Sequence, residues 1–355
     1  NIEKKMGLKG SATCEMTFGE TKPAVGYLVG NVHDGIAQMF NVIEHARMAI
    51  GMKSMSQLSC AYLNSLDYAK TRTQGADLPK AHDKTSPRVA IIEHPDVKRM
   101  LMLLKSYSEG MRAFGLWTAN LRDLVDVEKA KKTDEATKKA HLLEKMQDLS
   151  LPLVKGFFSE KVYDLLSISL QVFGGSGYCK DYPIEQYIRD QKIDTLYEGT
   201  TQIQAQDLIF RKILRDKGEV MKVVLGGLEE RLAKGMSVDT LKGDVELIQK
   251  GYAHFQKMTL ALQEKIGENL YHAGLQGNRY LYAFSTMMIS SFLVEHAAIA
   301  SEKMKTAKGD DAHFYRGKVE SMRFFAREIM PEMKRDLEVI SNSSLHIMDV
   351  PTECF

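Results

Sequence analysis

From about residue 33 onward, apolar residues recur at steps of three and four, which predicts long amphipathic helices. The first predicted helix extends to Arg72, with apolar positions at Met39, Phe40, Ile43, Ile50, Leu58, Tyr62, Leu66 and Ala69. Pro95 suits a first helical turn, so a second long helix is predicted from 97 to about 127. A third helical run spans roughly 135 to 173, and we expect an adjustment of the helix near Pro152. Long helices joined by short loops predict an antiparallel bundle.

The helical pattern continues beyond Lys217 with a different character. Four further helices are predicted at 220–234, 238–271, 280–305 and 313–340, some of them separated by Gly-Asp or Gly-Asn turns. No acid–base constellation is recognisable in this part, so we interpret it as a packing or assembly module. The sequence thus predicts an all-α fold, with a four-helix-bundle domain at 31–217 and an additional helical domain at 218–355.

Residues 1–30 have a different pattern, with glycines that punctuate short β-prone pieces. The piece from Thr13 to Phe18 shows partial alternation of apolar and polar positions. Two or three such short strands bury too little surface to form a stable sheet alone. We therefore interpret 1–30 as the end of a β-domain, a short β remnant before the helices.

A glycine cluster, Gly174-Gly175-Ser176-Gly177, ends the third helical run. One interpretation is a helix C-cap. The other is a place where exposed backbone N–H groups meet a phosphate or a sugar. The cluster is not a dinucleotide-binding fingerprint, because no strand precedes it and no βαβ unit surrounds it.

The stretch Tyr197-Glu198-Gly199-Thr200-Thr201-Gln202-Ile203-Gln204 places a carboxylate between an aromatic ring and a glycine, directly before a helix start. Thr201 and Gln204 have the spacing of a capping box. A glutamate with a fixed backbone and a ring that sheds water is a candidate general base. The alternative is a solvated loop glutamate before a helix.

Composition excludes several classes of function. Lys+Arg 48 against Asp+Glu 46 is nearly balanced, so a nucleic-acid partner is not expected. The four cysteines form no CxxC pair and the ten histidines show no HxxxH spacing, so no metal site is predicted. No run of about 18 apolar residues and no signal peptide is recognisable, so no integral membrane segment is predicted. The chain begins at Asn1 without an initiator methionine, which we interpret as a sign of a fragment.

Five motifs follow one another along the chain: Gly7-Leu8-Lys9-Gly10-Ser11-Ala12-Thr13-Cys14-Glu15; Glu44-x-x-Arg47 with Ile50-Gly51; Tyr68 through Gln74; Gln171 through Tyr178; and Tyr182-Pro183 with Arg189-Asp190 and Ile193 through Gln204. In this order they resemble the middle-to-carboxyl half of the acyl-CoA dehydrogenases. The tail after 217 is similar to the extra helical domain of a large-bodied subgroup of that family. The match covers about 200 residues and makes the base interpretation of Glu198 the preferred one.

The resemblance implies a reaction and a base. The family uses FAD to oxidise acyl-CoA thioesters to trans-2-enoyl-CoA in fatty acid β-oxidation. A base removes the α proton while the β hydrogen leaves as hydride, and Glu198 matches that base. The backbone N–H of the same residue matches the family's donor to the thioester carbonyl, as in an oxyanion hole. Tyr197 and Gly199 flank it and are assigned to substrate binding.

The resemblance also implies cofactor and substrate contacts. Arg72 matches an arginine that meets the FAD diphosphate of a neighbouring subunit, and a guanidinium fork suits phosphate. The FAD-binding assignments are Arg72, Gln74, Gln171, Gly174, Gly175, Gly177, Thr200 and Gln202. The family commonly has an aromatic residue after Arg-x-Gln, but Gly75 follows Gln74 here. Glu44 and Arg47 match an acyl-CoA-facing pair, and an intrahelical ion pair is the alternative.

Further expectations concern partners, location and competing functions. The resemblance implies an acyl-CoA substrate, an electron-transfer flavoprotein as electron acceptor and a homodimer or homotetramer. It implies a cytoplasmic location in a bacterium or the mitochondrial matrix in a eukaryote. The alternatives are an acyl-CoA oxidase and a non-catalytic helical assembly module. We expect the isolated fragment to bind FAD weakly or not at all and to show little activity.

Overall fold

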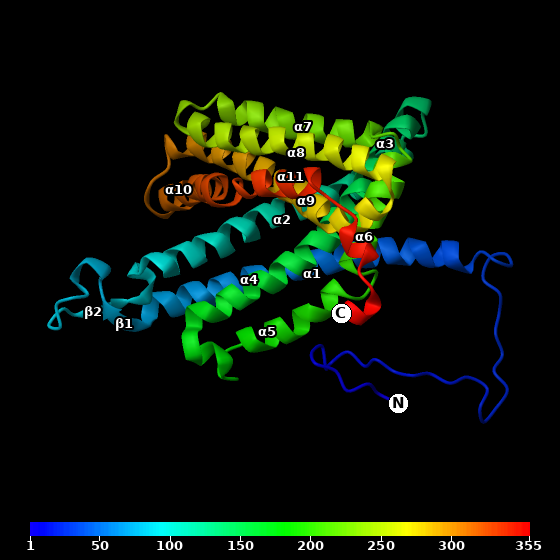
Figure 1. Cartoon of the computed structure of the whole chain (residues 1–355), viewed down its shortest axis with the longest axis horizontal. Helices are drawn as coiled ribbons and strands as arrows, with labels where there is room; N and C mark the ends of the chain where they lie inside the picture. The colour runs from blue at the N-terminus through cyan, green and yellow to red at the C-terminus, as the bar shows by residue number, and fades with distance from the viewer.

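The computed structural model describes residues 1–355, except for the side chain of Asn41. The first half contains the elements drawn from blue to green in Figure 1. They are α1 (Gly35–Thr71), β1 (Thr73–Ala76), β2 (Arg88–Ala90), α2 (Pro95–Ala130), α3 (Asp134–Pro152), α4 (Phe158–Phe173), α5 (Ile184–Gln191) and α6 (Thr201–Gln206). The predicted all-α fold is confirmed. β1 and β2 form a small antiparallel hairpin between α1 and α2.

The second half consists of α7 (Glu219–Met236), α8 (Lys242–Glu268), α9 (Tyr271–Met304), α10 (Gly309–Phe324) and α11 (Glu332–Ser341). The helix α9 begins at Tyr271, which the periodicity had placed at the end of the preceding helix. Asn269 causes this difference, since its side chain accepts a hydrogen bond of 2.9 Å from the N–H of Tyr271. The last predicted helix is divided by a π-helical segment, Phe325–Ile329, and by Pro331.

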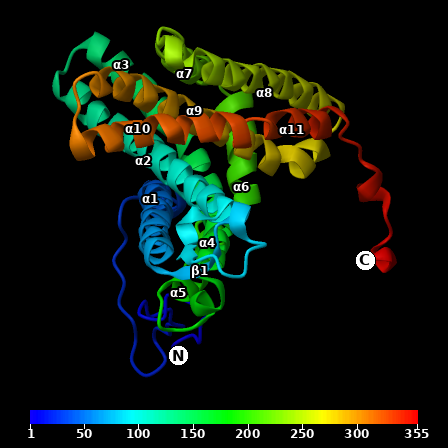
Figure 2. The same ribbon diagram turned by 90° about the vertical axis from the view of Figure 1, so that its left-hand side faces the viewer.

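The helices form two layers that share one core. Figure 2 shows α7 to α11 above the layer of α1, α2, α4 and α5. The helix α9 contacts both layers, and its buried residues join a cluster that also contains Phe114 of α2 and Phe158 of α4. α9 is long and apolar enough to pass a test for a membrane span, but 78% of the tested window is buried inside the protein. Such extensive burial is typical of a helix in the core of a protein.

A π-helical segment, Leu153–Phe157, joins α3 to α4. The adjustment predicted near Pro152 is therefore confirmed. Proline has no N–H to donate to the preceding turn, and a widened turn accommodates this loss. All five residues of the segment are buried, so the widened turn lies inside the protein and carries Lys155 into the core.

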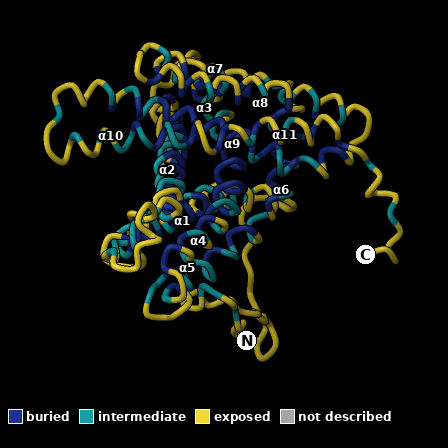
Figure 3. The backbone as a smooth tube through the Cα atoms, turned by 60° about the vertical axis from the view of Figure 1, so that its left-hand side comes forward, coloured by how far each residue is buried: buried dark blue, intermediate teal, exposed yellow. Residues whose placement is uncertain are grey.

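Residues 1–30 form an exposed segment that extends away from the helical body (Figure 3). Among the residues that the structure describes, the β-prone pieces pair only at a single bridge between Ile2 and Cys14, with no further strand beside them. The segment is attached to α5, where the N–H of Leu8 donates to Asp190 Oδ1 at 2.6 Å and Arg189 donates to the carbonyl of Met6 at 3.2 Å.

Candidate functional site

The residues assigned to the site fall into two groups at opposite ends of α4. The Glu198 group consists of Arg47, Tyr197, Glu198, Gly199, Thr200 and Gln202, with Glu44 one turn before Arg47 on α1. The Arg72 group consists of Arg72, Gln74, Gln171, Gly174, Gly175 and Gly177. The sixteen residues of α4 extend over roughly 24 Å at 1.5 Å per residue. The two groups therefore do not line one common site within this chain.

The backbone at Glu198 is unusual. Glu198 has φ +56° and Gly199 has φ +89°, so two consecutive residues lie in the left-handed region. This conformation costs a glutamate roughly 1–2 kcal/mol. Gln204 Nε2 donates to the carbonyl of Glu198 at 2.9 Å and to that of Gly199 at 3.3 Å. The N–H of Glu198 donates to no described residue, so it is available to a ligand.

The capping box predicted at Thr201 and Gln204 is wrong. Thr200 is the N-cap of α6, and no side chain caps the helix. The hydroxyl of Thr201 donates instead to Glu160 Oε1 at 2.6 Å. The side chain of Gln204 does reach back, but it reaches the carbonyls of residues 198 and 199. The left-handed turn directs these carbonyls toward the amide, a geometry that the spacing alone does not reveal.

Lys155 lies behind this turn and was missed by the sequence reasoning. Its side chain is fully buried, and its ammonium donates a hydrogen bond to the carbonyl of Gly199. Burial lowers the pKa of Lys155 to about 8, with a further lowering from Arg47, against opposing effects of Asp194, Glu160 and Glu198. One signal was available, since Lys155 is a lone charge in the apolar run Leu-Pro-Leu-Val-Lys-Gly-Phe-Phe.

Tyr197 is held by a buried carboxylate. Its hydroxyl donates to Asp194 Oδ1 at 2.8 Å, and Lys53 Nζ meets the same oxygen at 2.8 Å. Ser54 donates to the other oxygen of Asp194 at 3.3 Å. Burial, together with the bond to Asp194, raises the pKa of Tyr197. The network fixes the residue immediately before Glu198 to α1.

Arg47 forms an ion pair with Asp207 across the site. Arg47 Nη1 lies 3.1 Å from Asp207 Oδ2, and the two side chains are 11% and 6% exposed. The intrahelical pair between Glu44 and Arg47 that was considered is not found among the described ion pairs. Glu44 is instead exposed, on the wall of a cavity of about 340 Å³ that Ala119 and Leu151 also line.

The two remaining residues of the Glu198 group lie at the start of α6. Thr200 is exposed. Gln202 donates through Nε2 to the carbonyl of Gly274 at 3.0 Å, which connects α6 to α9. The amide of Gln202 is therefore engaged with the second helical layer in this chain.

The Arg72 group is solvent-exposed apart from Gly177. Arg72 is the C-cap of α1, and its carbonyl accepts a hydrogen bond from the N–H of Ile91 at 2.8 Å. The carbonyl of Gln74 lies 2.7 Å from His94 Nε2. The side chains of Arg72, Gln74 and Gln171 lie on the exposed surface.

The three glycines of the Arg72 group have different structural roles. Gly174 caps α4 with φ +58°, as the C-cap interpretation expects. Added Cβ atoms at Gly174 or Gly175 would meet no atom within 4 Å, so a ligand can approach the backbone there. Gly177 is buried, and a Cβ there would lie 2.8 Å from Phe173 Cβ. Packing therefore explains Gly177, whereas open space surrounds the other two.

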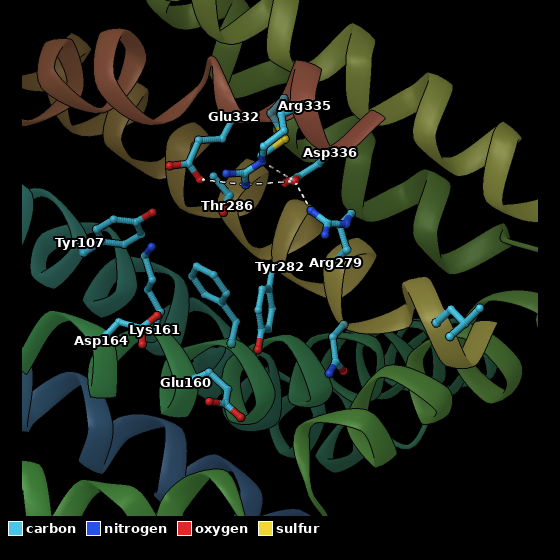
Figure 4. A pocket seen from close by; sticks show the side chains of 14 residues that line it. Tyr107, Glu160, Lys161, Asp164, Arg279, Tyr282, Thr286, Glu332, Arg335 and Asp336 are labelled. Carbon is cyan, nitrogen blue, oxygen red and sulfur yellow. Dashed lines mark hydrogen bonds and ion pairs between the residues drawn. The ribbon is translucent and has the colours of Figure 1, made fainter. Parts of the chain in front are cut away.

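A cavity of about 360 Å³ lies between the layers, and its lining includes no residue of the Glu198 group. Figure 4 shows Glu160 and Tyr282 on its lower wall and Arg279, Arg335 and Asp336 on its upper wall. Asp336 is paired with both arginines, at 2.7 and 3.1 Å. Asp336 and the two arginines therefore form ion pairs with one another at the rim of the cavity. No cluster of three or more metal-ligating side chains occurs among the described residues.

Two family models match this chain. "Acyl-CoA dehydrogenase, C-terminal domain" matches residues 33–213, and "Acetyl-CoA dehydrogenase C-terminal like" matches residues 220–351.

Among curated relatives, a broad-specificity linear acyl-CoA dehydrogenase, FadE5, of Mycobacterium tuberculosis is 47% identical and covers 100% of this chain. A butyryl-CoA dehydrogenase of Syntrophomonas wolfei is 31% identical over 99% of this chain. The chain spans 59% and 57% of the length of these two relatives.

Two solved structures share the fold. ACDH-11 of Caenorhabditis elegans, in complex with C11-CoA, has a TM-score of 0.72 at 17% identity and matches over 96% of this chain and 54% of its own. An acyl-CoA dehydrogenase of Bacillus anthracis, complexed with FAD, has a TM-score of 0.70 at 20% identity, over 98% of this chain and 58% of its own.

Proposed function

Because the chain belongs to the acyl-CoA dehydrogenase family, we propose that the full-length protein carries out FAD-dependent α,β-dehydrogenation of acyl-CoA thioesters to trans-2-enoyl-CoA, with Glu198 as the base. The observation that carries this proposal is the left-handed turn at Glu198 and Gly199. It leaves, on one residue, a half-buried carboxylate and a backbone N–H that donates to none of the described residues. The proposal is made for the full-length protein because the relatives are longer than this chain.

The carboxylate and the backbone N–H of Glu198 have complementary roles in the proposed reaction. Its carboxylate accepts the α proton of the substrate. Its N–H donates to the thioester carbonyl, where negative charge develops as the proton leaves, and a donor of this kind is worth a few kcal/mol. The turn that fixes the backbone of Glu198 also fixes the direction of its N–H, and the carboxylate extends from the same residue.

The described residues fit FAD at two places. The exposed guanidinium of Arg72 and the open backbone at Gly174 and Gly175 can meet phosphate or sugar oxygens. At the other group, Thr200 is exposed and belongs to the same turn as Glu198. Bound FAD would supply the acceptor for the β hydrogen as hydride. The chain contributes the proton acceptor and the contacts.

The separation of the two groups supports an assembly of subunits. Roughly 24 Å of α4 lies between them, so a site that uses both takes them from different subunits. We propose a homodimer or a homotetramer in which Arg72 of one subunit serves the site of its neighbour. An electron-transfer flavoprotein is the proposed electron acceptor.

The experiment is a product analysis of the full-length protein with a series of acyl-CoA chain lengths. The proposal expects trans-2-enoyl-CoA, detected by mass spectrometry, in amounts that depend on an artificial electron acceptor. Absence of enoyl product with every chain length, in a protein that has FAD bound, would contradict it. Stoichiometric hydrogen peroxide without an added acceptor would identify the alternative, an acyl-CoA oxidase.

A further inference from the structure

The buried lysine behind the Glu198 turn has no task in the proposed reaction. We propose that Lys155 is a positioning residue, which holds the left-handed turn at Glu198 and Gly199 through its hydrogen bond to the Gly199 carbonyl. This inference rests on the proposed function, because it concerns how the base of that reaction is oriented. Lys155 itself touches no reacting atom.

Packing alone does not explain a lysine at this position. Its side chain has no exposed surface, yet no carboxylate lies within ion-pair distance of its ammonium among the described salt bridges. Burying an ammonium without a carboxylate partner costs several kcal/mol. An apolar side chain of similar length would fill the same space without that cost. The distinguishing contact of Lys155 is the hydrogen bond to the Gly199 carbonyl.

The local backbone brings the ammonium to that carbonyl. Lys155 lies in the middle of the π-helical segment Leu153–Phe157, all of which is buried. The segment packs against α1, α6 and α9, so the lysine stem is enclosed on several sides. Because the aliphatic part of the Lys155 side chain is enclosed, its ammonium can hold the turn at Glu198 and Gly199 in one position.

The turn requires donors of this kind. Two consecutive residues with positive φ direct the carbonyls of Glu198 and Gly199 toward the interior, where they need partners. Gln204 is shared between both carbonyls, at 2.9 and 3.3 Å. Lys155 is the second donor to Gly199. If it is lost, Gly199 can rotate its peptide planes at little cost, and the carboxylate and N–H of Glu198 lose their fixed direction.

Charged groups surround the lysine from four elements. Arg47 faces it from α1, Asp194 from the 3-10 turn after α5, Glu160 from α4 and Glu198 from the turn itself. Glu160 is also tied to α6 by Thr201 and lies on the cavity wall in Figure 4. The three carboxylates favour the ammonium form without pairing directly with it, which leaves its hydrogen bond for Gly199.

The test compares four variants of the full-length holoenzyme. Lys155→Met removes the donor and keeps the length, and Lys155→Gln keeps an N–H donor of shorter reach. Lys105→Met is the matched control, since Lys105 is also largely buried and donates to a backbone carbonyl, that of Gly317, at 3.2 Å. Glu198→Gln reports on the base. Turnover, KM, FAD content and melting temperature are measured for each.

We expect Lys155→Met to lower kcat by about 10- to 100-fold, with KM and FAD content within about twofold of wild type, and Lys155→Gln to recover part of the loss. Lys105→Met should lower the melting temperature with kcat unchanged. A normal kcat for Lys155→Met, or a fall in kcat that only follows the fall in the amount of folded protein, overturns the inference. Should that variant not fold, Lys155→Leu, which also lacks a donor, takes its place, and a normal kcat for it overturns the inference. Full turnover by Glu198→Gln would instead reject the proposed function.

Discussion

Arg47 and Asp207 form an enclosed ion pair of 3.1 Å between α1 and the π-helical segment Asp207–Leu214 that follows α6. Arg211 approaches the other oxygen of Asp207 at 3.4 Å. Tyr197 is tied to α1 through Asp194 and Lys53 on the preceding side of Glu198. The chain is thus anchored to α1 both before and after the turn that carries the base.

Breaking this ion pair should destabilise the fold. Asp207→Asn leaves Arg47 almost enclosed without a charge partner, which costs about 3–5 kcal/mol. The measurement is the free energy of unfolding in urea. Asp148→Asn is the control, because Asp148 pairs with Lys212 but is 42% exposed, and we expect a loss of about 1 kcal/mol or less. Equal losses in the two variants would contradict the account.

Lys155 makes a specific contribution to the pH dependence of stability. Its pKa is about 8 in the folded protein against 10.5 in the unfolded chain, so between these values the unfolded chain binds more protons. The contribution of Lys155 to the free energy of unfolding therefore rises as the pH increases from about 8 to 10.5, by roughly 3 kcal/mol at most. Urea unfolding of wild type and Lys155→Gln between pH 7 and 10 checks this, and parallel pH curves for the two proteins would contradict it.

The glycines after α4 should respond differently to alanine. Gly177→Ala places a Cβ 2.8 Å from Phe173 Cβ, and such crowding costs about 1–3 kcal/mol. Gly175→Ala meets no atom within 4 Å, so its stability should equal that of wild type. If the Gly175 backbone contacts FAD, this variant should bind FAD more weakly. Equilibrium dialysis measures the affinity, and unchanged binding would remove Gly175 from the cofactor site.

Subunit sharing can be tested by complementation. Arg72→Ala and Glu198→Gln should each be inactive alone. In a mixed dimer with a shared site, one of the two sites carries both defects and the other is intact. A randomised mixture of equal amounts should therefore recover about a quarter of wild-type turnover. No recovery after verified subunit exchange would show that both residues serve a site within one chain.

The sequence predicts helices well where the periodic pattern of apolar residues extends over many turns, as in α1 and α2. It fails at Asn269, where a local turn, with the Asn269 side chain accepting from the N–H of Tyr271, separates α8 from α9. The site is predicted less completely. The motif identifies Glu198, but the partner of Arg47 lies 160 residues away along the chain, and local spacing cannot reveal such a contact. Lys155 was missed because its importance depends on a π-helical turn and a carbonyl direction.

The reductive half-reaction tests the assignment of Glu198 most directly. Full-length wild-type protein and Glu198→Gln, both with FAD bound, are mixed anaerobically with an acyl-CoA that wild type accepts, and flavin absorbance is followed by stopped flow. The account predicts rapid bleaching in wild type and a rate at least about 10³-fold lower in the variant, since a lost acid–base catalyst costs about 10²–10⁴-fold. Bleaching of Glu198→Gln at the wild-type rate would contradict it.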